Sequence, residues 1–122
     1  MGQTYFFAPK IILNMRLQKV FVYGTLLKPR IQKQLFGCQP EIVAPAKLKG
    51  WVLIEHKENP AIIPSESKTV EGMVIHLTED QLRIADEYEE TPQVYQRERV
   101  TVRTAAGDFY NVWAYTRRNP VP

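Results

Sequence analysis

The strongest feature of the hydrophobic pattern is an apolar run, Val20-Phe21-Val22-Tyr23, that stops at Gly24. β-Branched and aromatic residues in such a run are typical of a buried strand. A glycine and Thr25 directly after it predict a turn, where the glycine can adopt unusual backbone angles and let another group approach the main chain. Unpaired N–H groups at the end of the strand could hold a carboxylate or an oxyanion. A core strand followed by an ordinary tight turn is the simpler interpretation.

Two segments have the spacing of amphipathic helices. The first starts at Pro29, which suits a first helical turn, and Gly37 predicts its end. The second starts after Thr78, which has the capping-box spacing with Gln81, and ends near residues 89–90. Its inner face is predicted to contain Leu82, Ala85 and Tyr88.

The rest of the chain is predicted as short strands separated by glycine and proline turns. The strand candidates are 42–44, 46–49, 51–54, 70–77, 94–103 and 109–115. Residues 61–64 are predicted to be extended, residues 65–68 to form a polar loop, and residues 106–108 to form a hairpin turn. Many short strands with two short helices predict an α+β fold, a small and mostly antiparallel β-barrel with flanking helices.

The length of 122 residues suits a single domain, and 44% hydrophobic residues can supply its core. We expect this domain over residues 19–118, after an N-terminal extension over 1–18 and before a loose tail over 119–122. No apolar stretch reaches the roughly 18 residues that span a membrane, and the extension does not resemble a signal peptide. Cys38 is the only cysteine and cannot form an internal disulfide, which favours a cytoplasmic location.

Charge and motifs narrow the chemistry further. The net charge is +3, but the basic residues are spread out, which favours solvated faces over a nucleic-acid site. The only histidines, His56 and His76, do not have metal-ligand spacing, so no metal site is predicted. Nucleotide-binding loops and serine-nucleophile motifs are absent from the sequence. We expect no nucleic-acid or membrane partner, and a monomer or weak homodimer.

Residues 86–90, Asp-Glu-Tyr-Glu-Glu, form an acidic cluster at the predicted end of the second helix. Negative charge is unfavourable at a helix C-terminus, so one of these carboxylates is expected to serve a purpose other than stability. Glu89 shares the inner face with Leu82 and Ala85 by helical spacing. A carboxyl group that faces an apolar interior has a raised pKa, which suits a general acid and base. A solvated helix end is the alternative.

The run Val-Phe-Val-Tyr-Gly-Thr-Leu at 20–26 resembles the signature of the γ-glutamylcyclotransferase-like family. That family includes the plant avirulence-induced, or AIG2-like, proteins and small bacterial proteins of the UPF0131 type. Four further stretches resemble the family pattern in order, and the match runs from about residue 19 to 116. They are Asn-Pro-Ala-Ile-Ile-Pro at 59–64, Val-Glu-Gly-Met-Val at 70–74, Ala-Asp-Glu-Tyr-Glu at 85–89 and Val-Tyr-Gln-Arg-Glu-Arg-Val-Thr-Val at 94–102.

The resemblance implies a small β-barrel and a cofactor-independent reaction. A γ-glutamyl amine or γ-glutamyl amino acid would close to 5-oxoproline and release a free amine. By position, Glu89 would be the general acid and base, and Tyr23-Gly24-Thr25-Leu26 would bind the substrate carboxylate through main-chain N–H groups. Tyr95 and Tyr115 would close the pocket. The resemblance implies no metal and no cofactor.

The chain departs from the family pattern at three places, which put the substrate rather than the reaction class in question. Glu90 stands where a glycine or small residue is frequent, Ala85 where leucine is usual, and Gly72-Met73 where Gly-Glu is common. Two alternatives stay open. The first is a non-catalytic small-molecule-binding or regulatory module on the same fold. The second is an oligonucleotide-binding barrel that uses Phe109, Tyr110, Trp113 and Tyr115.

Overall fold

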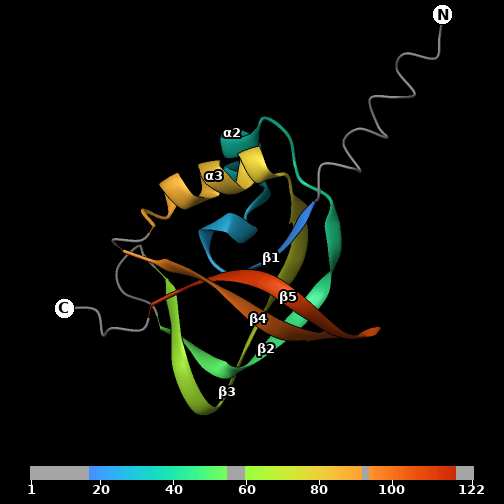
Figure 1. Cartoon of the computed structure of the whole chain (residues 1–122), viewed down its shortest axis with the longest axis vertical. Coiled ribbons are helices and arrows are strands. Elements are labelled where there is room, and N and C mark those ends of the chain that lie inside the picture. The colour runs from blue at the N-terminus through green and yellow to red at the C-terminus, as the bar shows by residue number, and fades with distance from the viewer. Residues whose placement is uncertain (1–16, 55–59, 92–93, 118–122) are drawn as a thin grey trace, which may run out of the picture.

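The structure, a computed structural model, describes residues 17–54, 60–91 and 94–117. In these ranges the strands form a closed barrel in the order β1-β3-β2-β4-β5, and two α-helices lie together on its outside (Figure 1). The predicted α+β barrel with flanking helices is therefore confirmed. The predicted tail lies outside the described residues. The predicted extension lies almost wholly outside them, and the first strand already begins at Gln18.

The strands are β1 (Gln18–Val22), β2 (Ile42–Ile54), β3 (Ala61–Leu77), β4 (Gln96–Thr104) and β5 (Gly107–Thr116). A short 3-10 helix, η1 (Thr25–Leu27), follows β1, and the α-helices are α2 (Pro29–Phe36) and α3 (Glu79–Tyr88). The strand pairs are antiparallel, except that β1 and β5 pair in parallel and so close the barrel. The three segments predicted between residues 42 and 54 are one strand, β2.

The prediction of a polar loop at residues 65–68 is wrong, because these residues lie inside the continuous strand β3. The register of β3 against β2 places all four of them opposite Gly50 alone. The Ser65 hydroxyl accepts hydrogen bonds from the N–H groups of Ser67 and Lys68, which closes the irregularity locally. Extra residues in such a bulge have no cross-strand partner, and this explains why the segment is polar and turn-like in sequence.

Strand β1 lies between two apolar clusters. Val20 and Val22 pack on one face with Leu82 and Ala85 of α3, whereas Phe21 packs on the other face with a cluster made only of strand residues. The first cluster joins the helices to the barrel, and the second fills the barrel interior. Because both faces of β1 are covered, its sequence is an unbroken hydrophobic run without polar alternation.

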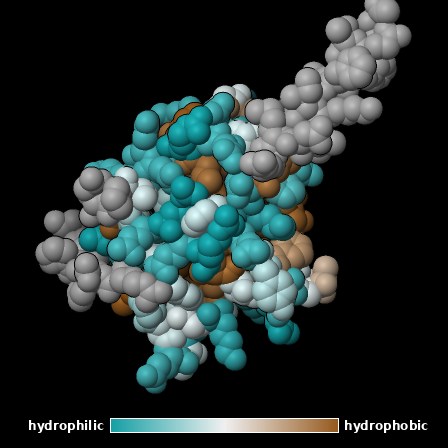
Figure 2. Space-filling model, viewed as in Figure 1, coloured by the Kyte–Doolittle hydropathy of each residue, from teal (hydrophilic) through white to brown (hydrophobic). Residues whose placement is uncertain are grey.

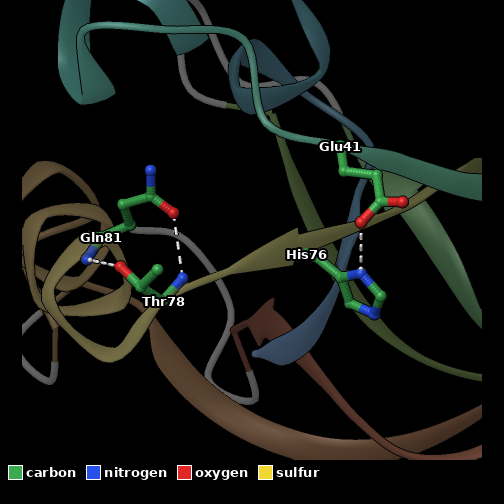
Figure 3. A network of polar contacts seen from close by, with 4 residues as sticks. All are labelled: Glu41, His76, Thr78 and Gln81. Atoms are coloured by element: carbon green, nitrogen blue, oxygen red, sulfur yellow. Dashed lines mark hydrogen bonds and ion pairs between the residues drawn. The ribbon is translucent and has the colours of Figure 1, made fainter. Parts of the chain in front are cut away.

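The start of α3 is fixed by the predicted capping box. The Thr78 hydroxyl accepts a hydrogen bond from the Gln81 N–H (3.1 Å), and Gln81 Oε1 accepts one from the Thr78 N–H (2.9 Å) (Figure 3). Just before it, Nδ1 of His76 lies 3.0 Å from Oε1 of Glu41. The capping box fixes the first turn of α3 directly after the end of β3, and the contact of His76 with Glu41 ties that end of β3 to the chain before β2. The helix length then determines where its acidic C-terminus lies.

Gly72 in β3 allows β1 to approach closely. A Cβ atom at this position would lie 2.3 Å from the backbone oxygen of Val22 and 2.8 Å from Cζ of Phe21. Glycine is therefore needed where the two backbones meet. Since Val22 is the last residue of β1, the place of the following turn depends on this approach.

Figure 2 shows mostly hydrophilic residues on the face in view, with hydrophobic residues in small separate patches. Surface hydrophobic residues scattered in this way are usual for a globular protein. No helix in the described part of the chain is long and apolar enough to cross a membrane. The expected monomer or weak homodimer stays a prediction.

Candidate active site

A cavity of about 280 Å³ lies between the end of β1 and the end of α3. Its lining consists of Phe21, Val22, Tyr23, Gly24, Thr25, Leu26, Pro60, Tyr88, Glu89, Glu90, Val94, Tyr95 and Tyr115. This lining includes every residue predicted for the site, namely Glu89, the turn at 23–26, Tyr95 and Tyr115. The fold thus brings the predicted acid and the predicted anion-binding turn to one cavity, which is the geometric requirement for both to act on one ligand.

The turn after β1 presents main-chain donors. In η1 the N–H of Leu27 donates to the oxygen of Gly24 (2.9 Å), and the N–H of Lys28 donates to the oxygen of Thr25 (3.0 Å). The N–H groups of Thr25 and Leu26 come earlier, in the first turn, where a helix has no acceptor of its own for them. Two neighbouring amides at the cavity are therefore suited to a carboxylate, as the strand-glycine-threonine pattern predicts.

Gly24 itself differs from its prediction in one respect. Its φ of −111° and ψ of −127° lie outside the helical and the extended regions, as predicted for this glycine. An added Cβ, however, would meet Pro60 Cβ at 3.6 Å, an ordinary contact distance. The approach that only glycine permits occurs at Gly72 instead. Gly24 therefore leaves room beside Pro60, while Gly72 allows β1 to lie close to β3 just before the turn.

Glu89 is the C-terminal capping residue of α3, and its N–H donates to the oxygen of Ala85 (2.9 Å). Burial raises the pKa of its carboxyl group to about 7. This is the direction and the cause predicted from its place on the inner face. A carboxyl group with such a pKa can both accept and donate a proton near neutral pH.

Tyr88 was predicted on the buried face of α3, and this is wrong. Its exposure is 39%, and it lies at the cavity. Positions spaced by three drift around a helix of 3.6 residues per turn, so the stripe of Leu82 and Ala85 has rotated away by residue 88. Position 89 is seven residues after Leu82, nearly two full turns, and therefore stays on the inner face.

The chain leaves α3 through a Schellman motif. The N–H of Thr91 donates to the oxygen of Asp86 (2.9 Å), and the N–H of Glu90 donates to the oxygen of Glu87 (3.1 Å). Glu90 occupies the left-handed position of this motif, with φ 56°. Glycine is the residue that this conformation favours. The motif therefore explains physically why a glycine suits the position after Glu89.

Three tyrosines donate their hydroxyl hydrogens to the protein. Tyr23 donates to the backbone oxygen of Tyr115 (2.5 Å), Tyr95 to the backbone oxygen of Pro60 (2.8 Å), and Tyr115 to Oδ1 of Asp86 (2.6 Å). Burial is the main cause that raises the pKa of each of these hydroxyls, so they remain protonated at neutral pH. A phenol has one hydrogen to donate, so each oxygen can only accept from a ligand.

Asp86 and Arg97 were not predicted as members of the site. Oδ1 of Asp86 accepts the hydrogen bond from Tyr115 and also lies 3.0 Å from Nε of Arg97, with which it forms an ion pair. The Nε–H group of Arg97 is not aligned for a hydrogen bond in this pair. The Arg97 guanidinium in turn lies 4.1 Å from the centre of the Trp113 ring. The sequence held one signal for Asp86, because it lies three residues before Glu89 and so on a neighbouring part of the same helix surface. The other lining residues had no predicted role at the site, namely Phe21, Val22, Pro60, Tyr88, Glu90 and Val94.

The aromatic residues named for the oligonucleotide-binding alternative lie in different environments, and the expectation of no nucleic-acid partner stays a prediction. Phe109 packs against the cluster in the barrel interior, and Tyr115 packs in the helix-facing cluster. Trp113 is flanked by guanidinium groups of Arg97 and Arg99. The aromatic residues therefore do not share one face on which bases could stack. In the described ranges no group of three or more His, Cys, Asp or Glu side chains is arranged to hold a metal ion, and His56 lies outside those ranges.

Comparisons with known proteins agree with this fold. The model of a family described as gamma-glutamyl cyclotransferase, AIG2-like, matches residues 20–122. A solution structure from Arabidopsis thaliana is similar with a TM-score of 0.75 and 29% identity, over 87% of this chain and 72% of that one. A crystal structure of a mouse AIG2-like protein is similar with a TM-score of 0.72 and 22% identity, over 88% of this chain and 81% of that one. A structure named gamma-glutamyl cyclotransferase is similar with a TM-score of 0.73 and 19% identity, over 85% of this chain and 68% of that one. The search of curated proteins found no match.

Proposed function

Because the chain belongs to the gamma-glutamyl cyclotransferase, AIG2-like family, we propose that it closes a γ-glutamyl amine or γ-glutamyl amino acid to 5-oxoproline. The observation that carries this proposal is the position of Glu89. Its carboxyl group has a pKa of about 7 and lines the same cavity as the turn at 23–26. A proton-transfer group and an anion-binding turn in one small cavity are what such a ring closure needs.

The cavity is polar in a way that suits the α-amino-acid head of a γ-glutamyl group. The substrate carboxylate accepts hydrogen bonds from the N–H groups of Thr25 and Leu26. The α-ammonium group needs acceptors, and the hydroxyl oxygen of Tyr115 is available in that role, since its hydrogen is donated to Asp86. The ionised carboxyl group of Glu89 is a further acceptor, and its raised pKa suits it to take the proton.

In the proposed reaction Glu89 removes a proton from the α-ammonium group, and the free amine attacks the γ-carbonyl carbon of the same molecule. A five-membered ring forms through a tetrahedral intermediate. Glu89 then gives its proton to the leaving nitrogen, and the bond between this nitrogen and the γ-carbon breaks. The ring nitrogen loses its second proton to Glu89, which passes it to the released amine, so the carboxyl group ends ionised as it began. The products are 5-oxoproline and the free amine, so neither water nor a cofactor is consumed. The nucleophile and the carbonyl are already linked, so the enzyme contributes conformation and proton transfer.

The test is the release of 5-oxoproline from a panel of γ-glutamyl compounds by the wild type, Glu89→Gln and the control Glu87→Gln. Glutamine has the same shape but cannot transfer the proton, so we expect Glu89→Gln to lower kcat by about 10²–10⁴-fold. Glu87 is exposed and does not line the cavity, so Glu87→Gln should match the wild type. An unchanged rate in Glu89→Gln contradicts the mechanism. Binding without turnover across the panel favours the non-catalytic module on the same fold.

A further inference from the structure

The charges around the cavity point to the kind of leaving group that the proposed reaction releases. Glu89 and Glu90 are the only charged residues in the described lining. The guanidinium of Arg117 is not part of the lining, but it lies 5.6 Å from the Tyr95 ring and opposes the rise in the pKa of the Tyr95 and Tyr23 hydroxyls, so its positive charge reaches the tyrosine side of the cavity. Once Glu89 is engaged in proton transfer, Glu90 is the only charged residue left in the described lining itself.

Glu90 lies at the mouth of the cavity, because it lines the cavity and is also exposed. It makes no ion pair with any residue in the ranges that the structure describes. The hydrogen bonds of the Schellman motif fix the backbone on both sides of it. The Glu90 carboxylate therefore stands on a fixed backbone, and no described residue pairs with it.

The mechanism places the leaving group beside Glu90. Glu89 must reach the leaving nitrogen to protonate it, and Glu90 lines the same cavity at its exposed side. The cavity of about 280 Å³ is at the lower limit of ligand pockets, which measure about 300–1,000 Å³. A glutamyl head held between the turn and Glu89 uses much of this space, so the rest of the substrate leaves through the mouth.

We infer that Glu90 selects substrates whose leaving amine carries a second positive charge, such as the γ-glutamyl derivative of a diamine. A leaving amino acid instead carries a carboxylate, which Glu90 repels at short range. This inference rests on the proposed function and narrows its substrate class. Because the site is partly exposed to solvent, we expect a preference of about tenfold in kcat/KM for a cationic over a neutral leaving group.

The experiment uses three probes of similar length, which are the γ-glutamyl derivatives of 1,4-diaminobutane, butylamine and 4-aminobutyrate. They release a cationic, a neutral and an anionic amine. The kcat/KM for 5-oxoproline release is measured for the wild type, Glu90→Gln, Glu90→Lys and Glu87→Gln. We expect the order cation, neutral, anion in the wild type and in Glu87→Gln. The preference should disappear in Glu90→Gln, reverse in Glu90→Lys, and weaken in high salt.

The possible failures are distinguishable. Equal kcat/KM for the three probes in the wild type, or a preference that survives in both Glu90 variants, overturns the inference about Glu90. The proposed function still stands in that case if 5-oxoproline is released and Glu89→Gln abolishes the release. No release from any probe by a folded wild-type protein overturns the proposed function, and the inference falls with it. Thermal melts of the four proteins show that each variant is folded.

Discussion

The two sides of the cavity supply their polar groups in different ways. On the β1 side, the turn at 23–26 offers main-chain N–H groups, whose direction depends on backbone conformation. On the α3 side, Glu89 and Glu90 offer side-chain carboxyl groups, which depend on residue identity. The first side should therefore tolerate changes of side chain but not of backbone path. The second should respond to changes of one or two atoms.

The largest expected effect comes from moving one carboxyl group. Glu89→Asp keeps the charge but withdraws the carboxyl group by one methylene, and a displacement of about 1 Å can cost about 100-fold in rate. Thr25→Val replaces a hydroxyl with a methyl group and leaves the main-chain donors in place, so its rate should stay within about threefold of the wild type. Steady-state release of 5-oxoproline measures both. Equal losses in the two variants would remove the distinction between the two sides.

The next effect is a dependence of stability on pH that belongs to the α3 side. Glu89 has a pKa of about 7 in the folded protein and 4.5 as its ordinary value. Between these values the folded state holds more protons, so the free energy of unfolding falls as pH rises. The fall should be on the order of 2 kcal/mol, after allowance for partial contact with solvent. Urea unfolding at pH 5 and pH 7.5 measures it.

Glu89→Gln is the reference for this measurement, because glutamine does not titrate. The difference between pH 5 and pH 7.5 should be smaller in Glu89→Gln than in the wild type. A difference of the same size in both proteins would show that other groups cause the pH dependence.

A smaller effect tests the backbone of the β1 side. In Gly24→Ala the added Cβ meets Pro60 at 3.6 Å, an ordinary contact, so activity should be nearly unchanged. In Gly24→Val the further methyl groups press on the proline ring and displace the turn, and we expect a loss of about tenfold in kcat/KM. Gly24→Val should also lose more activity than Thr25→Val. The reverse order would mean that the Thr25 side chain, rather than the main chain, binds the substrate.

The smallest effect concerns the backbone of the α3 side. Glu90 has φ 56°, a conformation that costs an ordinary residue about 1–2 kcal/mol. Glu90→Gly and Glu90→Ala both remove the carboxylate, but only glycine also relieves the conformation. Glu90→Gly should therefore be about 1 kcal/mol more stable than Glu90→Ala in urea unfolding. Equal stability of the two variants would show that the left-handed conformation is not a significant cost.

Features set by neighbouring residues could be predicted from the sequence. The capping box of Thr78 and Gln81 and the end of α2 at Gly37, with φ 77°, depend only on local hydrogen bonds and backbone angles. The direction of Glu89 follows from helix periodicity over seven residues. Each of these is a short-range rule, and each holds in the structure.

Features set by distant partners could not be predicted in the same way. Residues 65–68 look like a loop because their place in a bulge depends on the register against Gly50 of another strand. The tight approach belongs to Gly72 rather than Gly24, because it depends on how closely β1 and β3 lie. The hydrogen bond from Tyr115 to Asp86 links residues 29 positions apart, and no sequence spacing indicates it.

The parallel pairing of β1 with β5 also has a consequence for the order of events during protein synthesis. The hydrogen bond from Tyr23 to the backbone of Tyr115 joins residues 92 positions apart. At about 5–20 residues per second, the ribosome needs about five to twenty seconds to add the second after the first. During that time a nascent chain already contains the turn and, later, Glu89, but not the strand that carries Tyr115. The cavity, which Tyr115 lines, can therefore be complete only after the last strand of the described barrel has left the ribosome.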